Sequence, residues 1–241
     1  MKGVILAGGL GSRLAPLTFV TNKHLLPVYD KPMIYYPLET MRKAGITDVM
    51  VVIGGPHAGH FIPLLKNGED FGMSIRYSYQ EEEGGIAEAL SLTEGFADGE
   101  SIFVVLGDNI TERNFMQDVI TMDHSSLAGN ACIFLKETKM PENFGVVEWD
   151  SGKLVSIIEK PKNPPSNQAV LGMYFFPYDV YTYIKKLSYS ERGELEVTDL
   201  NNIYIKKGKM IAITHPEYWS DCGSFDTMLS TSLYMKQLNE K

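Results

Sequence analysis

The chain of 241 residues carries 30 acidic and 22 basic side chains, a net charge of −8, and 44% hydrophobic residues. Its length suits one large α/β domain or two small ones with a buried core. The negative charge argues against nucleic-acid and membrane-surface binders, which need a basic face. Two cysteines make no disulfide framework, and no segment approaches the roughly 18 apolar residues of a membrane span. We therefore expect a cytoplasmic protein with no nucleic-acid or membrane partner.

Apolar segments rich in Val and Ile alternate with helical patterns in the first half of the chain. The pattern predicts strands at 3–7, 48–53, 74–78 and 101–106, and helices near 34–44, 59–65 and 86–96. Nearly continuous apolar strands separated by helices indicate a parallel sheet covered on both faces. The predicted fold class is therefore a Rossmann-like, doubly wound α/β fold with a mostly parallel central sheet.

The second half contains shorter strands separated by polar turns. We predict strands at 131–135, 145–149, 154–159 and 170–176, and helices at 178–187, 197–207 and 225–237. A proline-containing stretch at 160–167 is short enough to be a loop rather than a linker. We therefore expect a single domain over 1–241.

A glycine-rich turn directly follows the first predicted strand, with the sequence Gly8-Gly9-Leu10-Gly11-Ser12-Arg13. Glycines let backbone N–H groups converge on an anion, and the arginine adds a forked cationic donor. The Gly-Lys-Ser/Thr end of a P-loop is missing, and Leu14 occupies the third glycine position of a dinucleotide fingerprint. The turn predicts a nucleotide site of another kind.

A second polar loop, Gly107-Asp108-Asn109, follows the strand at 101–106. Ligands of parallel sheets bind at the carboxyl ends of the strands, so the two loops are expected to meet at one site. Asp108 suits Mg²⁺, with Asp221 of Trp219-Ser220-Asp221-Cys222-Gly223 as the candidate second carboxylate. A turn-forming or capping role is the alternative for either aspartate.

Three further groups of side chains can be interpreted either as functional residues or as ordinary surface residues. Lys23 either balances phosphate charge or extends to solvent, and Glu159-Lys160 either binds a substrate or forms a surface ion pair. His57 and His60 share helical spacing but lack a third ligand, which favours a surface position. The acidic run Glu81–Glu83 predicts a solvated loop.

Motifs over almost the whole chain resemble those of the sugar-nucleotide nucleotidyltransferases, especially the members that join a thymidine nucleotide to glucose 1-phosphate. They are Leu6-Ala7-Gly8-Gly9-x-Gly11-Ser12-Arg13-Leu14, Asn22-Lys23-x-Leu25-Leu26-Pro27-Val28-Tyr29-Asp30-Lys31-Pro32-Met33-Ile34-Tyr35-Tyr36-Pro37-Leu38, Leu106-Gly107-Asp108-Asn109, Phe144-Gly145-Val146-Val147-Glu148, Glu159-Lys160-Pro161, Gly193-Glu194-Leu195-Glu196-Val197-Thr198-Asp199 and Trp219-x-Asp221-x-Gly223.

The resemblance implies a Mg²⁺-dependent transfer of a thymidylyl group from dTTP to glucose 1-phosphate, feeding dTDP-rhamnose or a related deoxysugar of cell-surface polysaccharide. It implies a nucleotide-binding N-terminal half, a sugar-binding C-terminal half and a homotetramer. Carried over by residue, it places the catalytic role on Arg13 and Lys23 and the metal on Asp108 and Asp221. The nucleotide would contact Leu6, Gly8, Gly9, Gly11, Ser12, Arg13, Gln80, Gly85 and Asp108, and the sugar phosphate would contact Gly145, Glu159, Lys160 and Tyr174.

The chain departs from the family pattern at His24, Phe144 and Cys222, and in the acidic segment after Gln80. It resembles a short form without the C-terminal regulatory extension, so weak or absent feedback inhibition by a dTDP-sugar is expected. Two alternatives stay open: a transferase that uses UTP, and a catalytically silent sensor of nucleotide sugars.

Overall fold

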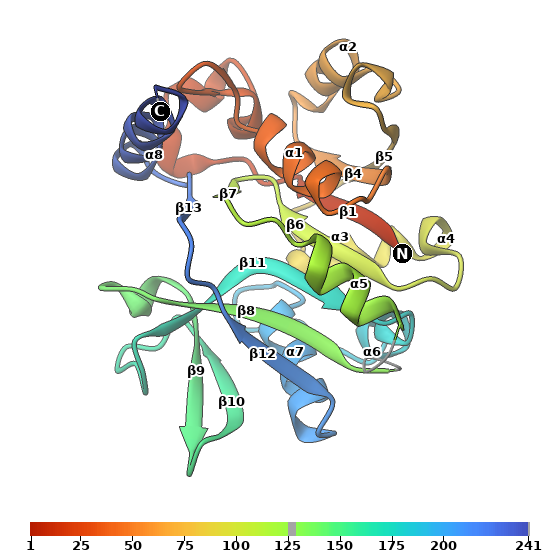
Figure 1. The fold of residues 1–241 in the computed structure, drawn as a ribbon, viewed down its shortest axis with the longest axis vertical. Coiled ribbons are helices and arrows are strands. Elements are labelled where there is room, and N and C mark those ends of the chain that lie inside the picture. Colours follow the sequence, from red (N-terminus) through yellow and green to blue (C-terminus); the bar gives the residue numbers. More distant parts are fainter. Residues whose placement is uncertain (125–128, 241) are drawn as a thin grey trace. The chain divides into compact units, whose positions relative to one another are not determined.

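The computed structural model describes residues 1–124 and 129–240, with the backbone alone at 122–124. The chain groups into two compact units. Figure 1 shows the elements of both, coloured along the sequence. The glycine-loop unit comprises residues 2–83, 105–120 and 217–241. The hairpin unit comprises residues 1, 84–104 and 121–216.

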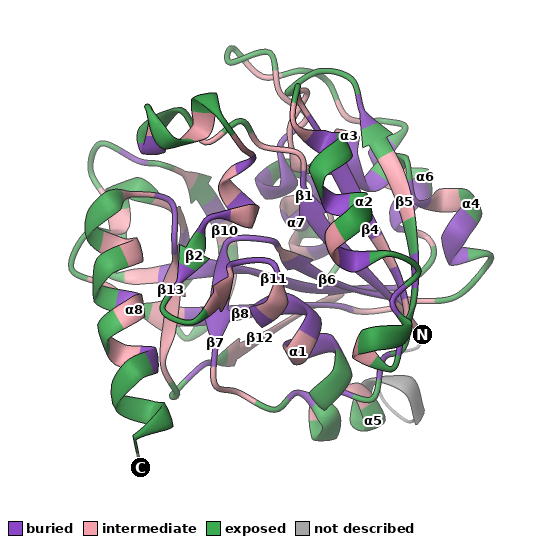
Figure 2. Cartoon of the chain, turned by 90° about the horizontal axis from the view of Figure 1, so that it is seen from above, coloured by how far each residue is buried: buried purple, intermediate pink, exposed green. Residues whose placement is uncertain are grey.

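A parallel sheet forms the centre of the glycine-loop unit. Strand β1 (Lys2–Ala7) pairs in parallel with β4 (Asp48–Gly54), which pairs in parallel with β5 (Ser74–Gln80). The β1 and β4 segments are almost entirely buried, as the purple ribbons of Figure 2 show. Burial on both faces explains why these strands are continuous apolar runs rather than alternating ones.

Helices and one-turn 3₁₀ segments complete this unit. The helices are α1 (Tyr35–Lys43), α2 (Phe61–Leu65), the start of α5 (Met116–His124) and α8 (Phe225–Asn239). The 3₁₀ segments are Ser12–Leu14, Leu17–Phe19, Lys23–Leu25, Ala58–His60 and Glu69–Phe71. Helix α8 begins with a capping box, because Ser224 and Thr227 each accept the other's backbone N–H.

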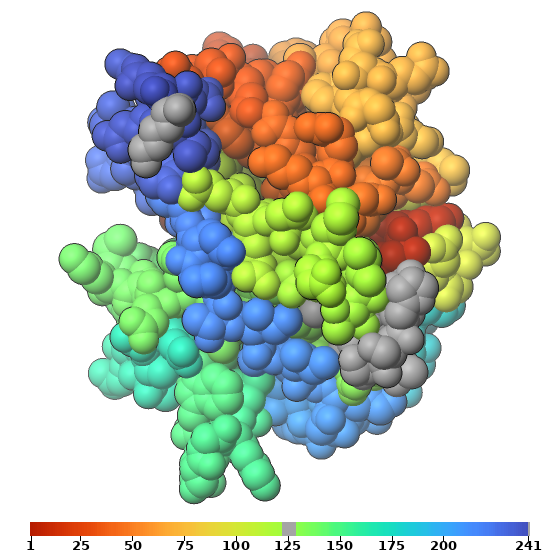
Figure 3. Space-filling model, viewed as in Figure 1, coloured from red at the N-terminus to blue at the C-terminus, as the bar shows by residue number. Residues whose placement is uncertain are grey.

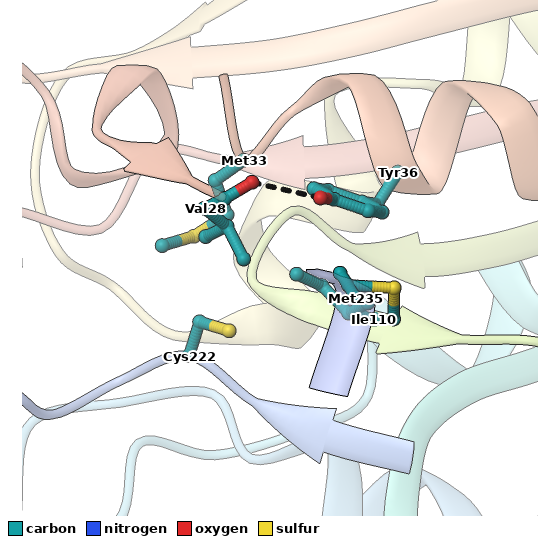
Figure 4. Packing of buried hydrophobic residues seen from close by; sticks show 6 residues of the cluster. All are labelled: Val28, Met33, Tyr36, Ile110, Cys222 and Met235. Atoms are coloured by element: carbon teal, nitrogen blue, oxygen red, sulfur yellow. Dashed lines mark hydrogen bonds between the residues drawn. The ribbon is translucent and has the colours of Figure 1, made fainter. Parts of the chain in front are cut away.

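A small apolar cluster anchors the C-terminal segment of the chain to the N-terminal one. It consists of Val28, Met33, Tyr36, Ile110, Cys222 and Met235, which Figure 4 shows pointing toward one another. The Tyr36 hydroxyl donates to the Val28 carbonyl at 2.7 Å. The packing holds α8 beside the red-orange N-terminal atoms of Figure 3, and it fixes the backbone around Cys222.

Two short antiparallel pairs flank this cluster. Strand β2 (Pro27–Val28) pairs with β3 (Lys31–Pro32), and β7 (Asn109–Thr111) pairs with β13 (Trp219–Asp221). The second pair sets Asn109 opposite Asp221. Its position next to Asp108 makes it part of the candidate site.

The hairpin unit is mostly antiparallel. Strands β9 (Gly145–Asp150) and β10 (Lys153–Glu159) form the hairpin, and β11 (Gln168–Phe176) pairs with β8 (Ala131–Glu137), which pairs in parallel with β12 (Met210–Thr214). Its helices are α3 (Ile86–Ser91), α4 (Glu94–Ala97), α6 (Val180–Ile184) and α7 (Val197–Lys206), with a 3₁₀ turn at Pro141–Asn143. The chain passes from one unit to the other within β6 (Ile102–Leu106) and again within α5.

The predicted fold class, with a mostly parallel central sheet and helices, is confirmed. The single helix predicted over 86–96 is wrong, because it breaks into α3 and α4 at the buried Thr93. The Thr93 hydroxyl hydrogen-bonds to the Leu90 carbonyl and to the Tyr181 hydroxyl. These bonds give the buried hydroxyl group polar partners at the point where the helix breaks. Within the described residues, no helix is long and apolar enough to cross a membrane.

Candidate active site

The glycine-rich loop starts where β1 ends, and it passes close to two neighbouring segments. A Cβ atom at Gly8 would lie 2.5 Å from Oε1 of Gln80, the last residue of β5. A Cβ atom at Gly54 would lie 3.0 Å from the Gly8 carbonyl oxygen. The backbones at the ends of β1, β4 and β5 therefore approach one another closely at Gly54, and Gly8 leaves room for the Gln80 side chain.

Lys23 lies along the inner side of this loop. Gly11 has φ of +68°, and a Cβ atom there would come within 2.7 Å of the Lys23 Cβ. A Cβ atom at Gly9 would lie 3.7 Å from the Lys23 Nζ. The glycines thus make room for a lysine whose ammonium group lies next to the turn.

The Lys23 ammonium forms an ion pair with Asp108. Their Nζ and Oδ2 atoms are 2.5 Å apart, and both side chains are largely buried. Burial alone would raise the pKa of Asp108, but the charge of Lys23 and the hydrogen bonds from Lys23 and the Asn109 amide together hold that pKa well below its usual range. Asp108 is therefore a carboxylate at neutral pH.

A buried hydrogen-bond network positions Lys23. The Asn22 side-chain oxygen accepts the backbone N–H of His24 at 2.9 Å and the His24 Nδ1–H at 2.7 Å. The Asn22 amide donates to the Ala7 carbonyl at the end of β1. Burial, and then the charge of Lys23, lower the pKa of His24 to about 3, so its imidazole is neutral. His24 supports the loop from within the core.

Asp221 lies next to Asp108 at the end of the β7–β13 pair. The Cys222 N–H donates to the Asp108 carbonyl at 2.9 Å, and the Trp219 indole N–H donates to the Asn109 side chain at 2.7 Å. Burial and the nearby Asp108 carboxylate raise the pKa of Asp221 to about 6. The two carboxylates therefore repel each other.

Arg13 brings a second cation to Asp221. A Cβ atom at Gly223 would lie 2.5 Å from the Arg13 Nη2 and 3.6 Å from the Asp221 Oδ2. Glycine at 223 thus leaves space for the guanidinium group. Its charge lowers the pKa of Asp221, opposing the burial of that carboxyl.

The donor set fits a divalent cation that takes the rest of its ligands from a substrate. Within residues 1–121 and 129–240, no group of three His, Cys, Asp or Glu side chains could hold a metal ion. Magnesium usually takes only one or two carboxylates and completes its shell with phosphate oxygens and water. Asp108 and Asp221 supply two carboxylates whose mutual repulsion a cation would relieve.

A second cluster of polar residues lies in the hairpin unit, at the open end of the β9–β10 pair. Glu159 is opposite Gly145, and its Oε2 accepts the Thr198 hydroxyl at 2.6 Å. Lys160 has φ of +42°, and its Nζ is 3.5 Å from Glu159 Oε1. A half-exposed ammonium beside an anchored carboxylate can bind a phosphate and a hydroxyl group together.

Arg192 completes this cluster, although the sequence analysis did not select it. Its guanidinium group donates to both oxygens of Glu196 at 2.8 Å and lies 3.6 Å from Glu159 Oε1. Its position just before the Gly193–Asp199 motif was the only available signal. The Glu159 carboxylate therefore has two cationic neighbours, Lys160 and Arg192.

The other predicted residues fall into two groups. Within the glycine-loop unit, Leu6 lies next to the loop that carries Asp108, because the Leu6 carbonyl accepts the Gly107 N–H at 2.8 Å. In the hairpin unit, Gly85 has φ of +96° and faces the Leu195 backbone. Tyr174 is buried and its ring stacks on Phe176, so its proposed contact with a sugar stays a prediction.

The nucleotidyl transferase family model matches residues 2–237, which includes both clusters. The chain belongs to the nucleotidyl transferase family. It is 40% identical to glucose-1-phosphate thymidylyltransferase of Neisseria meningitidis serogroup A, over 98% of this chain and 83% of the relative. It is 39% identical to the protein of that name from Mycolicibacterium smegmatis, over 99% of this chain and 83% of the relative.

Two solved structures have the same fold as this chain. A Bacillus anthracis protein assigned as a glucose-1-phosphate thymidylyltransferase, in complex with sucrose, superimposes with a TM-score of 0.92 at 41% identity, over 97% of this chain and 94% of that one. A UDP-glucose pyrophosphorylase in complex with UDP-glucose matches with a TM-score of 0.85 at 24% identity, over 98% of both chains, and shows the fold alone.

A double-mutant cycle tests the ion pair of this transferase. Lys23→Met leaves the Asp108 carboxylate largely buried without its cation, so we expect a loss of about 3 kcal/mol in the free energy of unfolding. Asp108→Asn in the same chain removes that charge and should recover about 1–3 kcal/mol of the loss. Urea unfolding of the four proteins measures both values, and strictly additive losses would show that the two groups are not coupled.

Proposed function

We propose that this nucleotidyl transferase transfers a thymidylyl group from dTTP to α-D-glucose 1-phosphate, giving dTDP-glucose and pyrophosphate. The observation that carries the proposal is the convergence of the glycine-rich loop, Lys23, Asp108 and Asp221 in one unit. The names of relatives about 40% identical over nearly the whole chain support the choice of substrates. The product would feed dTDP-rhamnose or a related deoxysugar.

The glycine-loop unit is proposed to bind the nucleotide. Backbone N–H groups of the loop and the Arg13 guanidinium would hold the triphosphate, and Gln80 would hydrogen-bond the base. Lys23 lies between the loop and Asp108, where its ammonium would stabilise the charge that develops on departing pyrophosphate. Gly85 is also proposed to contact the base.

Asp108 and Asp221 are proposed to hold Mg²⁺. When bound, the cation would supply positive charge to the phosphate oxygens and reduce the repulsion between the two anionic substrates. The carboxylate state of Asp108, maintained by Lys23, keeps one metal ligand ready at neutral pH.

The hairpin unit is proposed to bind glucose 1-phosphate. Glu159, held by Thr198, would accept sugar hydroxyl groups, and Lys160 would bind the phosphate. A phosphate oxygen of the sugar attacks the α-phosphorus of the nucleotide in line, forming a P–O bond as the bond to pyrophosphate breaks. That oxygen is already ionised at neutral pH, so the chain needs no general base and acts by positioning and charge neutralisation.

The proposal includes one catalytic domain, a homotetramer and a cytoplasmic location. A single family model that spans residues of both compact units supports the single domain. The compartment follows from the substrates, because nucleoside triphosphates are available in the cytoplasm.

Release of pyrophosphate from dTTP, UTP, ATP, CTP and GTP, each with Mg²⁺ and glucose 1-phosphate, tests the reaction. We expect a clear preference for dTTP, with loss of activity in Asp108→Asn because the buried metal ligand is removed. A preference for UTP would identify a uridylyltransferase. No release with any nucleotide, despite measurable dTTP binding, would favour the silent sensor.

A second substitution tests the sugar-phosphate cluster. Lys160→Ala removes one charge-assisted hydrogen bond, so we expect the KM for glucose 1-phosphate to rise about 10- to 100-fold while the KM for dTTP changes little. Lys162→Ala is the matched control, because Lys162 is an exposed lysine two positions along the same loop. Equal effects of the two substitutions on the KM would remove Lys160 from this role.

A further inference from the structure

The acidic segment after β5 is exposed, as the sequence predicts, but one of its carboxylates also contacts the glycine-rich loop. The backbone N–H of Leu10, in the middle of the glycine-rich loop, donates a 3.0 Å hydrogen bond to Glu83 Oε1. The two residues are 73 positions apart in the sequence. Glu83 is therefore exposed and, in addition, hydrogen-bonded to the loop.

A carboxylate bound to this loop occupies a position suited to a phosphate. The loop presents backbone N–H groups, and the cations of Arg13 and Lys23 lie beside it. An ionised carboxylate and a phosphate offer the same partner to an N–H group, a negatively charged oxygen. Glu83 thus acts as an anion that belongs to the protein itself.

The two sides of this contact differ in kind, because the donor is a backbone N–H and the acceptor is the end of a side chain. The Leu10 side chain lies over Gly55, where an added Cβ atom would come within 2.6 Å of Leu10 Cδ2. Glu83 is exposed and belongs to the short segment 81–85 between β5 and α3. A rotation of the Glu83 side chain is enough to free the Leu10 N–H.

We propose that Glu83 competes with the phosphate chain of the nucleotide for the Leu10 N–H and thereby sets the affinity for nucleotide. The inference rests on the proposed function only in taking a nucleoside triphosphate as the competing anion. Because binding requires the fraction of molecules in which Glu83 has left the loop, the apparent affinity is reduced by that fraction. The negative charge of Glu83 also opposes the approach of the triphosphate.

Calorimetric titration with dTTP and with inorganic tripolyphosphate, at fixed Mg²⁺ and salt, tests the proposal. Glu83→Ala is expected to lower the Kd for both ligands about three- to tenfold. Glu83→Gln, which keeps a weaker neutral acceptor, is expected to fall between wild type and alanine. Glu82→Ala is the matched control, because it removes the neighbouring exposed carboxylate of the same segment, and we expect less than about a twofold change there.

The outcomes separate this inference from the proposed function. Equal effects of Glu83→Ala and Glu82→Ala would show only a general charge effect and would overturn the inference. Weaker binding in Glu83→Ala would also overturn it, since Glu83 would then hold the loop ready for nucleotide. Tripolyphosphate carries no base, so its tighter binding would support competition by Glu83 even if dTTP proved to be the wrong substrate.

Discussion

The ion pair between Lys23 and Asp108 is the contact on which the candidate nucleotide site depends. It joins two segments 85 positions apart, and it places a cation beside the glycine-rich turn and a carboxylate at the end of β6. Neither side chain would remain charged at low cost without the other, because both are largely buried. The Asn22–His24 network and the glycines of the loop serve this arrangement by fixing the backbone on the lysine side.

The fold was largely predictable because buried strands correspond to continuous apolar segments in the sequence. The continuous apolar segments around Ile5 and Val51 predicted parallel strands, and the structure confirms them. The pair β7–β13 was not predicted, since three-residue strands have no periodicity of their own. Their pairing depends on contacts between segments 110 positions apart, such as that of Trp219 with Asn109. Such contacts cannot be inferred from local pattern.

The residues of the candidate site divide in the same way. Some could be predicted from the local sequence, whereas others depend on contacts between segments that are distant in the sequence. Gly8–Arg13 and Asp108 were predicted to be neighbours because parallel topology brings the carboxyl ends of strands together, and both lie beside Lys23. The position of Glu83 could not be predicted, since an acidic run looks the same whether it is solvated or bound to a distant N–H group. Arg192 was missed for a related reason: its role comes from its distance to Glu159, not from its neighbours in sequence.

Binding of Mn²⁺ in place of Mg²⁺, followed by electron paramagnetic resonance in the presence of dTTP, tests the central claim most directly. If Asp108 and Asp221 share a cation with the triphosphate, the free Mn²⁺ signal should fall when both wild-type protein and dTTP are present. Either Asp108→Asn or Asp221→Asn should weaken that ternary binding at least about tenfold, the effect of losing a charged ligand. Unchanged Mn²⁺ binding in both variants would contradict the assignment of the metal to these two carboxylates.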